Sequence, residues 1–441
     1  MIVFQGVFLT PYEACAIFCC VNMKNVVYVH RINANERLSM EKILVLNAGS
    51  TTLKFQLYNM EDNNYEIITG GAVERIGQAG SKLTVKVKGQ EVFSLEEPME
   101  NHKEAIKRVL GYLTKKDIKN TSELAAVAHR MGYGGDYDKS AAIDDKVMQS
   151  LYDSIPLIPL HGPAIAAGIK AMQELIPEVL QVAVFDTAFH QSVEKAGQMY
   201  ALPIEYFEKY KVRRYGFHGP SHNYVSRKAY KYLGYKGRFV CCHLGGGASV
   251  TAVKEGKSVM TSMGYTPSSG LVMSTRPGDI DPYIPLHIMK TQNKTADEVN
   301  ALLNKQSGLL GLTEGHADMR DIIEQAENGN EKCQLALKVY VYNIIKHIGA
   351  AIAQMGGIDA LIFTAGIGEK SAYIREKVCE KLGYLGLKLD DTANHAYPAP
   401  TEINAQDSAV KVLVIPTNEE LMMAKEAYDV YMEAQEMSEA V

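Results

Sequence analysis

The chain has 441 residues, of which 46% are hydrophobic and 22% are charged. This composition is typical of a soluble globular protein, and the length allows two or three domains. The formal net charge of −5 provides no basic footprint, so we expect no nucleic-acid partner. We also expect no membrane partner, because no segment reads as a membrane span. The seven cysteines are odd in number and irregularly spaced, which indicates free thiols in a reducing compartment such as the cytoplasm.

Residues 1–39 fit nothing that follows them. They begin apolar and rich in cysteine, but they lack the basic start and the small-residue cleavage site of a signal peptide. Met40 stands directly before the first predicted strand. We therefore expect the folded protein to begin near Met40.

Two segments share a pattern of strand, turn and strand. In residues 43–55 an apolar run is followed by Asn-Ala-Gly-Ser-Thr-Thr and an alternating run, and residues 239–253 repeat this around a triple-glycine turn. Turns of small residues expose backbone N–H groups that suit a phosphate, although an ordinary hairpin uses similar residues. The repetition suggests two copies of one fold. Their turns could close on one nucleotide from opposite sides.

Further elements follow the first hairpin. Residues 83–87 alternate and predict a third strand, and residues 105–113 have the apolar spacing of a helix. Residues 124–128 and 182–185 predict short buried strands, followed at once by His129-Arg130 and by Asp186-Thr187. Strand ends of open α/β sheets are where ligands bind.

Two polar segments flank the second hairpin. Residues 213–222 read RRYGFHGPSH, with two arginines and two histidines. The alternative to a binding role is a solvated loop with a helix capped at Ser221. Residues 275–282 read TRPGDIDP, a rigid loop that could hold a cation and an anion near each other.

The last part of the chain predicts a long apolar helix at 332–355, as core or subunit interface. A buried strand at 361–365, a glycine turn at 366–368 and a helix at 371–382 come next. This succession suits a nucleotide phosphate or ribose, although such glycine turns are common. A strand at 412–415, a polar turn and a C-terminal helix complete the chain.

Several stretches together resemble the acetate kinase family, of the acetate and sugar kinase, Hsc70 and actin superfamily. They occur in the family's order from about residue 41 to the end, and they read NAGSTTLKF (47–55), FDTAFHQS (185–192), RRYGFHGPSH (213–222), HLGGGAS (243–249), TP…GL…TRPGDIDP (266–282), DMRDI (318–322), TAGIGE (364–369) and PTNEEL (416–421).

The resemblance implies an α/β fold of two duplicated ribonuclease-H-like (actin-like ATPase) domains with a cleft between them. We expect one domain at 40–190 plus 420–441 and a second, nucleotide-binding domain at 191–419. The implied reaction is a reversible transfer of the γ-phosphoryl group of ATP to acetate, giving ADP and acetyl phosphate. The resemblance also implies Mg²⁺, with Mn²⁺ as an alternative, and a homodimer. A propionate or broader short-chain carboxylate kinase is the other candidate.

Site residues are carried over by position. In the resemblance the catalytic residues would be Asp186, His218 and Arg276, the substrate would meet Arg130, Leu160, Phe217 and Pro267, and Asn47 and Glu419 would belong to the metal site. The nucleotide would be lined by Lys54, His243, Leu244, Gly245, Gly246, Gly247, Asp318, Met319, Arg320, Gly366, Ile367, Gly368, Glu369 and Lys370.

Two departures from the family bear on specificity. Gly132 stands where the family usually has an aliphatic residue, so the acyl pocket has room for propionate or a longer acid. Met131 and Tyr133 could fill the same space. Lys370 replaces an asparagine and could alter the nucleotide preference.

A chain that starts at Met40 is expected to fold and to keep full activity, because nothing in residues 1–39 continues the pattern of the fold. Circular dichroism and steady-state kinetics of the two lengths check this. Loss of folding or of activity in the shorter chain would refute it.

Overall fold

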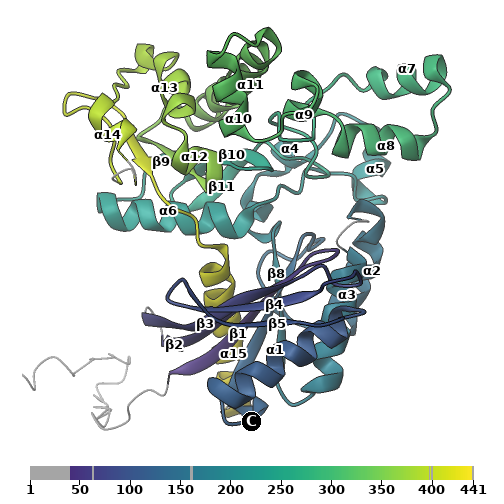
Figure 1. Cartoon of the computed structure of the whole chain (residues 1–441). Coiled ribbons are helices and arrows are strands. Elements are labelled where there is room, and N and C mark those ends of the chain that lie inside the picture. Colours follow the sequence, from purple (N-terminus) through teal and green to yellow (C-terminus); the bar gives the residue numbers. More distant parts are fainter. Residues whose placement is uncertain (1–39, 62–63, 159–161, 397, 399–400, 440–441) are drawn as a thin grey trace, which may run out of the picture.

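The computed structural model describes residues 40–61, 64–158, 162–396, 398 and 401–439. These residues build two mixed β-sheets, one of eight strands and one of five. The sheets form the lower and upper halves of the molecule, each with its own helices (Figure 1). The N-terminal segment 1–39 and Leu160 of the predicted substrate pocket lie outside the described residues.

The first sheet has the strand order β5-β4-β3-β2-β1-β6-β8-β7. The pairs β1–β6 and β6–β8 are parallel and the other pairs are antiparallel. The strands are β1 (Glu41–Ala48), β2 (Leu53–Glu61), β3 (Asn64–Glu74), β4 (Lys82–Val87), β5 (Gln90–Glu96), β6 (Leu124–Met131), β7 (Ala141–Ala142) and β8 (Leu180–Phe185).

The second sheet has the order β11-β10-β9-β12-β13. Its pairing repeats that of β3-β2-β1-β6-β8 in the first sheet: two antiparallel pairs followed by two parallel pairs. The predicted duplication is therefore confirmed. The strands are β9 (Arg238–Leu244), β10 (Ala248–Lys254), β11 (Lys257–Thr261), β12 (Ala360–Thr364) and β13 (Lys411–Val414).

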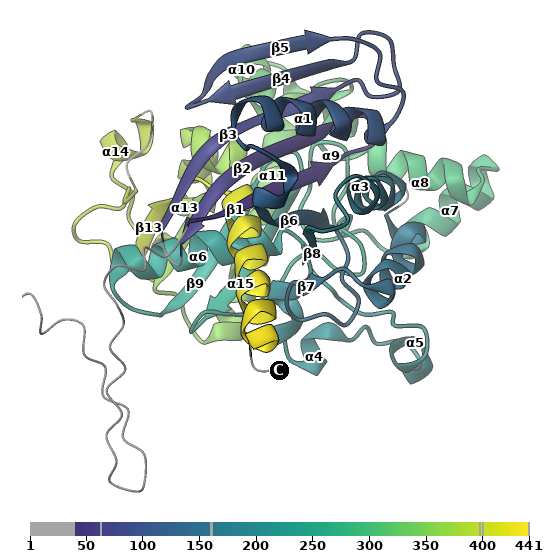
Figure 2. The same ribbon diagram turned by 90° about the horizontal axis from the view of Figure 1, so that it is seen from below.

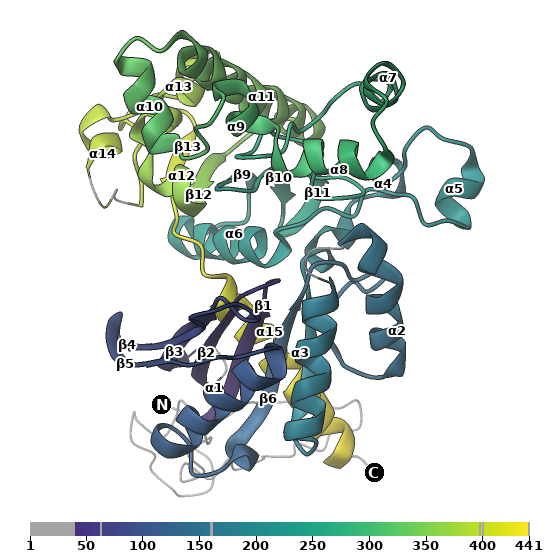
Figure 3. The ribbon, with the colours of Figure 1, turned by 45° about the vertical axis from the view of Figure 1, so that its right-hand side comes forward.

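Helices cover both faces of the first sheet. On one face α1 (His102–Lys116) and α3 (Gly162–Leu175) bury residues such as Ile106 and Met172 against β1, β2 and β4. On the other face α15 (Glu419–Glu439) packs Leu421 and Ala424 against β1, β6 and β8. Figures 2 and 3 show the sheet between α1 and α15. Such apolar burial contributes about 25 cal/mol per Å².

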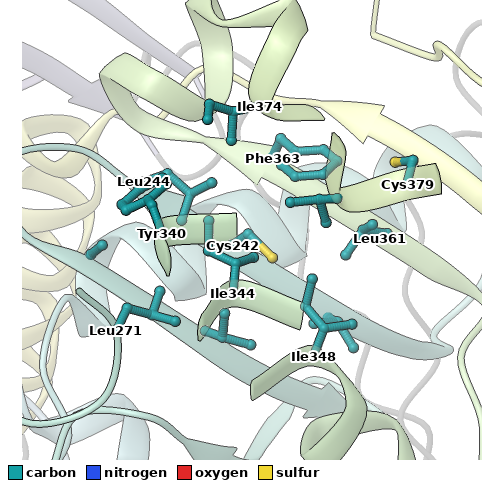
Figure 4. Packing of buried hydrophobic residues seen from close by; sticks show 14 of the residues in the cluster. Cys242, Leu244, Leu271, Tyr340, Ile344, Ile348, Leu361, Phe363, Ile374 and Cys379 are labelled. Atoms are coloured by element: carbon teal, nitrogen blue, oxygen red, sulfur yellow. The ribbon is translucent and has the colours of Figure 1, made fainter. Parts of the chain in front are cut away.

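The second sheet is covered in the same way. The largest core joins β9, β10 and β12 to α10 (Met319–Glu327), α11 (Glu331–Met355) and α13 (Ala372–Glu380), as Figure 4 shows for Cys242, Phe363 and Ile344. The opposite face holds α6 (Gly219–Leu233). The cysteines of the described residues, Cys241, Cys242, Cys333 and Cys379, are free, as predicted, and all four are buried.

Two helices cross between the halves. The helix α6 follows the last parallel strand of the first sheet but covers the second sheet. Conversely, α15 follows the last strand of the second sheet and returns to the first, as predicted. The two helices also pack against each other. This exchange ties the two halves together (Figure 1).

The remaining helices lie around the two sheets, and α7 and α8 project from the upper half (Figure 1). They are α2 (Asp145–Ser154), α4 (Lys195–Gln198), α5 (Ile204–Glu208), α7 (Tyr283–Gln292), α8 (Ala296–Lys305), α9 (Gly308–Thr313), α12 (Ala365–Lys370) and α14 (Asp391–His395).

Three sequence predictions need correction. The strand predicted as the third is β4, because β3 precedes it and its first residues are exposed on both faces. The glycine turn predicted at 366–368 is part of the short helix α12, whose first residue, Ala365, has a φ of +64°. Within the described residues one helix, α11, has the length and apolar composition of a membrane span, contrary to our expectation. Its buried residues belong to the second core.

Candidate active site

The three parallel strands of the first sheet end in polar residues at one edge. Asn47 is near the end of β1, Arg130 is near the end of β6, and Asp186 follows β8 directly. Carboxyl ends of neighbouring parallel strands share one edge of a sheet, so these side chains face the same space. All three line a single cavity.

Arg130 is held by two carboxylates. Its Nε donates to Asp186 Oδ1 over 3.0 Å, and its Nη2 donates to Asp186 Oδ2 over 2.9 Å. The remaining nitrogen, Nη1, lies 3.2 Å from Oε2 of Glu419, the first residue of α15. A bidentate arginine–carboxylate pair is among the strongest hydrogen-bonded contacts. The guanidinium is thereby fixed in one orientation between the two carboxylates.

The same contacts shift two pKa values. The negative charge of Asp186 raises the pKa of Arg130 above its ordinary value, against the opposing effect of burial, and Glu419 adds to the increase. For Glu419, burial works to raise the pKa, but Arg130, His243 and Lys54 together lower it below the usual value. At neutral pH the cluster therefore holds charged groups of both signs.

The RRYGFHGPSH segment is mostly buried, so its interpretation as a solvated loop was wrong. Ser221 is not the cap of α6 but lies inside the helix, where its hydroxyl bonds to His243 and Thr417. The helix starts at Gly219, whose N–H donates to the carbonyl of Asp186 over 2.9 Å. A Cβ at Gly219 would lie 2.3 Å from that oxygen, so only glycine permits this approach.

His218 precedes α6 in the left-handed region, with a φ of +59°. Its Nδ1 lies 2.9 Å from Ser249 Oγ, and its ring stacks on His243 at 4.1 Å between centroids. Arg276 is anchored by a bond of 2.6 Å from Nη1 to the carbonyl of Pro267. A Cβ built on Gly247 would lie 3.3 Å from His218 Nε2 and 3.6 Å from Arg276 Nη2. Both side chains thus end beside the triple-glycine turn.

The imidazole of His218 is neutral at physiological pH. Burial lowers its pKa well below the ordinary value, and His243, His222, Arg130 and Arg276 lower it further. A neutral imidazole can still donate one N–H bond. Arg276 remains a cation, although burial lowers its pKa as well.

These groups surround one cavity of about 350 Å³, to which both halves of the molecule contribute. Its wall has an apolar part and a polar part that carries arginine, lysine and carboxylate groups. The lining residues are Asn47, Ala48, Gly49, Thr52, Lys54, Arg130, Gly132, Ile158, Ile165, Asp186, Phe217, His218, Pro267 and Arg276.

Comparison with known proteins gives the family. Residues 42–425 match the acetokinase family. The chain belongs to the acetokinase family. A curated relative, the acetate kinase of Pseudothermotoga lettingae, is 47% identical over 392 residues, which are 87% of this chain and 96% of that protein.

Solved structures of acetokinase-family proteins have the same fold. The acetate kinase of Porphyromonas gingivalis superposes with a TM-score of 0.81 at 40% identity and covers 88% of this chain and 99% of its own. A propionate kinase from Francisella tularensis superposes with a TM-score of 0.83 at 38% identity and covers 89% and 100%. The chain therefore has the duplicated actin-like ATPase fold and is a kinase of the acetokinase family.

The residues predicted for this family's site fall into two groups. Eight of them line the cavity together. Glu419 does not line it but forms an ion pair with Arg130, which does. The predicted nucleotide residues other than Lys54 do not line the cavity. Among these, Asp318 caps α10 and binds Arg320, whose side chain is 88% exposed.

Two of the predicted nucleotide segments lie beside each other. A Cβ at Gly245 would be 3.7 Å from the Cβ of Ala365, so the triple-glycine turn faces the start of α12. At the other end of α12, Glu369 Oε1 accepts a bond of 3.2 Å from the N–H of Thr417. The segment Gly366–Lys370 is thereby linked to the turn that carries Glu419.

The sequence did not reveal four residues of the site. Ser249 is hydrogen-bonded to His218 and to His222. Ile158 and Ile165 form part of the apolar wall of the cavity. The two histidines of the RRYGFHGPSH segment were a usable signal for the contact with Ser249, because His218 and His222 are joined at the start of α6 by a backbone hydrogen bond. No pattern in a single sequence points to the two isoleucines.

Arg375, on α13, stabilises α12 through buried hydrogen bonds. Its side chain is 1% exposed and donates to the carbonyls of Gly368, Glu369 and Asn394 and to Asn394 Oδ1. Arg375→Leu leaves these buried oxygens unpaired, so we expect the free energy of unfolding to fall by at least about 2 kcal/mol. Chemical denaturation measures it.

The control is Arg108→Leu, which removes an exposed arginine whose side chain pairs with Glu97 on the surface. We expect it to change the free energy of unfolding by less than about 1 kcal/mol. Equal effects of the two variants would contradict the role of Arg375.

Proposed function

We propose that this protein is an acetate kinase that catalyses reversible, direct in-line transfer of the γ-phosphoryl group of ATP to acetate, giving acetyl phosphate and ADP. The observation that carries the proposal is the cavity in which Arg130, His218 and Arg276 converge beside an apolar wall. A filament or chaperone of the same fold has no need of these three groups at a second substrate site.

The chemistry requires cations rather than a strong base. A carboxylic acid with a pKa near ~5 is ionised at neutral pH and is already a nucleophile. Its approach to an anionic phosphate is opposed by charge, so both reactants must be neutralised and held in line. Arginine suits both tasks because its fork binds planar carboxylate or phosphoryl oxygens in pairs.

The roles follow from position in the cavity. We assign Arg130 to the substrate carboxylate, with Phe217 and Pro267 as apolar wall and Leu160 as a further wall residue from the family pattern. His218 and Arg276 are assigned to the transferring phosphoryl group as catalytic residues, with Asp186. The shared position of His218 Nε2 and Arg276 Nη2 beside Gly247 supports this assignment.

The oxygen donors of the site fit Mg²⁺. Asn47, Asp186 and Glu419 offer amide and carboxylate oxygens within one cluster, the ligand type that Mg²⁺ prefers, and Mn²⁺ accepts the same set. We assign Asn47 and Glu419 to the metal site and Asp186 to the orientation of the ion and its waters. When bound, the ion neutralises phosphate charge.

For the nucleotide we propose the triple-glycine turn, α12, the start of α10 and Lys54 of β2. The triple-glycine turn and α12 lie beside each other and offer backbone N–H groups without bulky side chains. The proposed residues are Lys54, His243, Leu244, Gly245, Gly246, Gly247, Asp318, Met319, Arg320, Gly366, Ile367, Gly368, Glu369 and Lys370.

We further propose that the protein is cytoplasmic, with one domain at 40–190 plus 420–441 and a second domain at 191–419.

We also propose that it forms a homodimer. Exposed apolar side chains on α5 and α7 support a dimer interface there, because Ile204, Tyr283 and Leu286 are 51%, 75% and 58% exposed. Both helices lie on one side of the molecule (Figures 1 and 3).

A broader carboxylate specificity is the second candidate, and Gly132 favours it. Gly132 lines the cavity, and a Cβ built on it meets no atom of the described residues within 4 Å. These residues leave room beside Gly132 for a longer acyl chain. We infer that propionate is accepted along with acetate.

An ATP-dependent hydroxamate assay with acetate, propionate and butyrate tests both candidates. The wild type should form acyl hydroxamate with acetate and with propionate. Gly132→Val should lower kcat/KM for propionate relative to acetate by roughly tenfold or more, because one methylene is worth about 1 to 3 kcal/mol. Gly111→Val, at an equally open glycine on α1, should leave the ratio unchanged.

An unchanged ratio in Gly132→Val would show that this residue does not set specificity. Absence of hydroxamate with every acid would overturn the proposed function.

Arg276→Ala is expected to lower kcat by roughly 10² to 10³, the usual loss for one electrostatic stabiliser of a transition state. Stopped or coupled assays at saturating substrates measure it. Arg238→Ala is the control. Arg238 pairs with Asp359 at the start of β9, whereas the triple-glycine turn beside Arg276 follows the end of that strand. A loss under tenfold in Arg276→Ala would mean that the residue is misassigned.

Asp186→Asn should raise the Mg²⁺ concentration for half-maximal rate roughly 10- to 100-fold and also lower kcat, because a partner of a metal site is lost. Titrating the rate with Mg²⁺ gives both quantities. Asp136→Asn is the matched control, as Asp136 pairs with Arg213 outside the cavity. An unchanged Mg²⁺ requirement in Asp186→Asn would argue against the assignment.

A further inference from the structure

Ser249, on β10, lies between His218, which directly precedes α6, and His222, in the first turn of that helix. Its Oγ is 2.9 Å from Nδ1 of His218 and 2.7 Å from Nε2 of His222. Ser249 and His222 are both fully buried. The backbone N–H of His222 donates to the carbonyl of His218 over 3.0 Å, which joins the two histidines at the start of α6.

One hydroxyl proton must serve both contacts. A serine hydroxyl donates one hydrogen bond and can accept two, so Ser249 can donate to one imidazole only. It could accept from both rings only if its own proton had another acceptor, and among the described residues its hydroxyl contacts the two imidazoles alone. Ser249 therefore donates to one ring and accepts an N–H bond from the other. Both rings are neutral, because burial lowers the pKa of each well below its ordinary value. Each ring therefore carries one proton, and only two arrangements remain.

The free nitrogen of His222 decides between the arrangements. Among the described residues no hydrogen-bond partner reaches Nδ1 of His222, which is buried. If Ser249 donated to His222, the proton of His222 would sit on this nitrogen as an orphaned buried donor, a rare and costly state. The proton of His222 therefore belongs on Nε2, where it is donated to Ser249 Oγ.

We propose that His222 and Ser249 are positioning residues that fix the tautomer and orientation of His218. His222 Nε2–H donates to Ser249, Ser249 Oγ–H donates to His218 Nδ1, and the proton of His218 is left on Nε2. That nitrogen lies on the cavity side, beside Gly247 and Arg276. A neutral His218 is thereby presented as a hydrogen-bond donor.

The consequence for catalysis rests on the proposed function. A donor held in place before the reaction stabilises developing charge without reorganisation. With the opposite tautomer, His218 would direct a lone pair at the phosphoryl oxygens and repel them. This relay, the hydrogen bonds from His222 through Ser249 to His218, thus makes a neutral imidazole a hydrogen-bond donor to an anion.

Nitrogen NMR of the protein labelled with ¹⁵N-histidine tests the relay directly, because protonated and bare ring nitrogens resonate far apart. Signals are assigned by their loss in His218→Gln and His222→Gln. We expect the proton on Nε2 in both rings of the wild type. A proton on Nδ1 of His218 would overturn the proposal.

Kinetics test the positioning role. Ser249→Ala should lower kcat about tenfold, the lower range for loss of a residue that orients a catalytic group, with both KM values within about twofold. Ser249→Thr keeps the hydroxyl and should recover most of kcat. Ser258→Ala is the control, because Ser258 binds the buried His190 in the same sheet but does not touch His218.

An unchanged kcat in Ser249→Ala would overturn the positioning role. The two proposals fail separately: a wild-type protein without acyl phosphate activity overturns the function, whereas the NMR spectrum decides the relay without any substrate.

Discussion

The fork between Arg130 and Asp186 is the contact on which the organisation of the cleft depends. It joins the ends of two neighbouring strands, and Glu419 extends it to the helix that returns from the second half. A cation must be kept for a carboxylate substrate, yet a buried cation without a partner is costly. The two carboxylates remove that cost while no substrate is bound. The arginine that we assign to the substrate and the two carboxylates that we assign to the metal site therefore form one ion-pair cluster.

The duplicated fold explains why the other groups of the site come from far apart in the sequence. Each sheet brings its turn of small residues and its strand ends to the same side, and α6 and α15 exchange places between the sheets. The start of α6 therefore carries His218 to the edge of the first sheet, while the start of α15 carries Glu419 there from the second. Residues of both halves line the cavity. In the proposed reaction, closure of the two halves would exclude water from the γ-phosphate.

The sequence predicted this framework well because its signals are local. Both hairpins, the strands before Arg130 and Asp186 and the long helix α11 have clear periodicity or apolar runs. The strand β3 was missed because its first half is exposed and shows no alternation. The turn before α12 was assigned to glycines although Ala365 adopts the positive φ. The contact of Ser249 with two histidines joins β10 to α6, and such tertiary pairing is invisible in one sequence.

We propose that Asp186 and Glu419 hold Arg130 until these carboxylates bind the nucleotide–metal complex, which frees the guanidinium for the substrate. Calorimetric titration of acetate into the enzyme, with and without saturating ADP and Mg²⁺, tests it most directly. If binding of ADP and Mg²⁺ frees Arg130, the two binding sites are linked and each ligand strengthens the binding of the other. We therefore predict a Kd for acetate at least about tenfold lower with ADP and Mg²⁺ present. An identical Kd in both titrations would contradict the account, since Arg130 would then bind the substrate regardless of its two carboxylate partners.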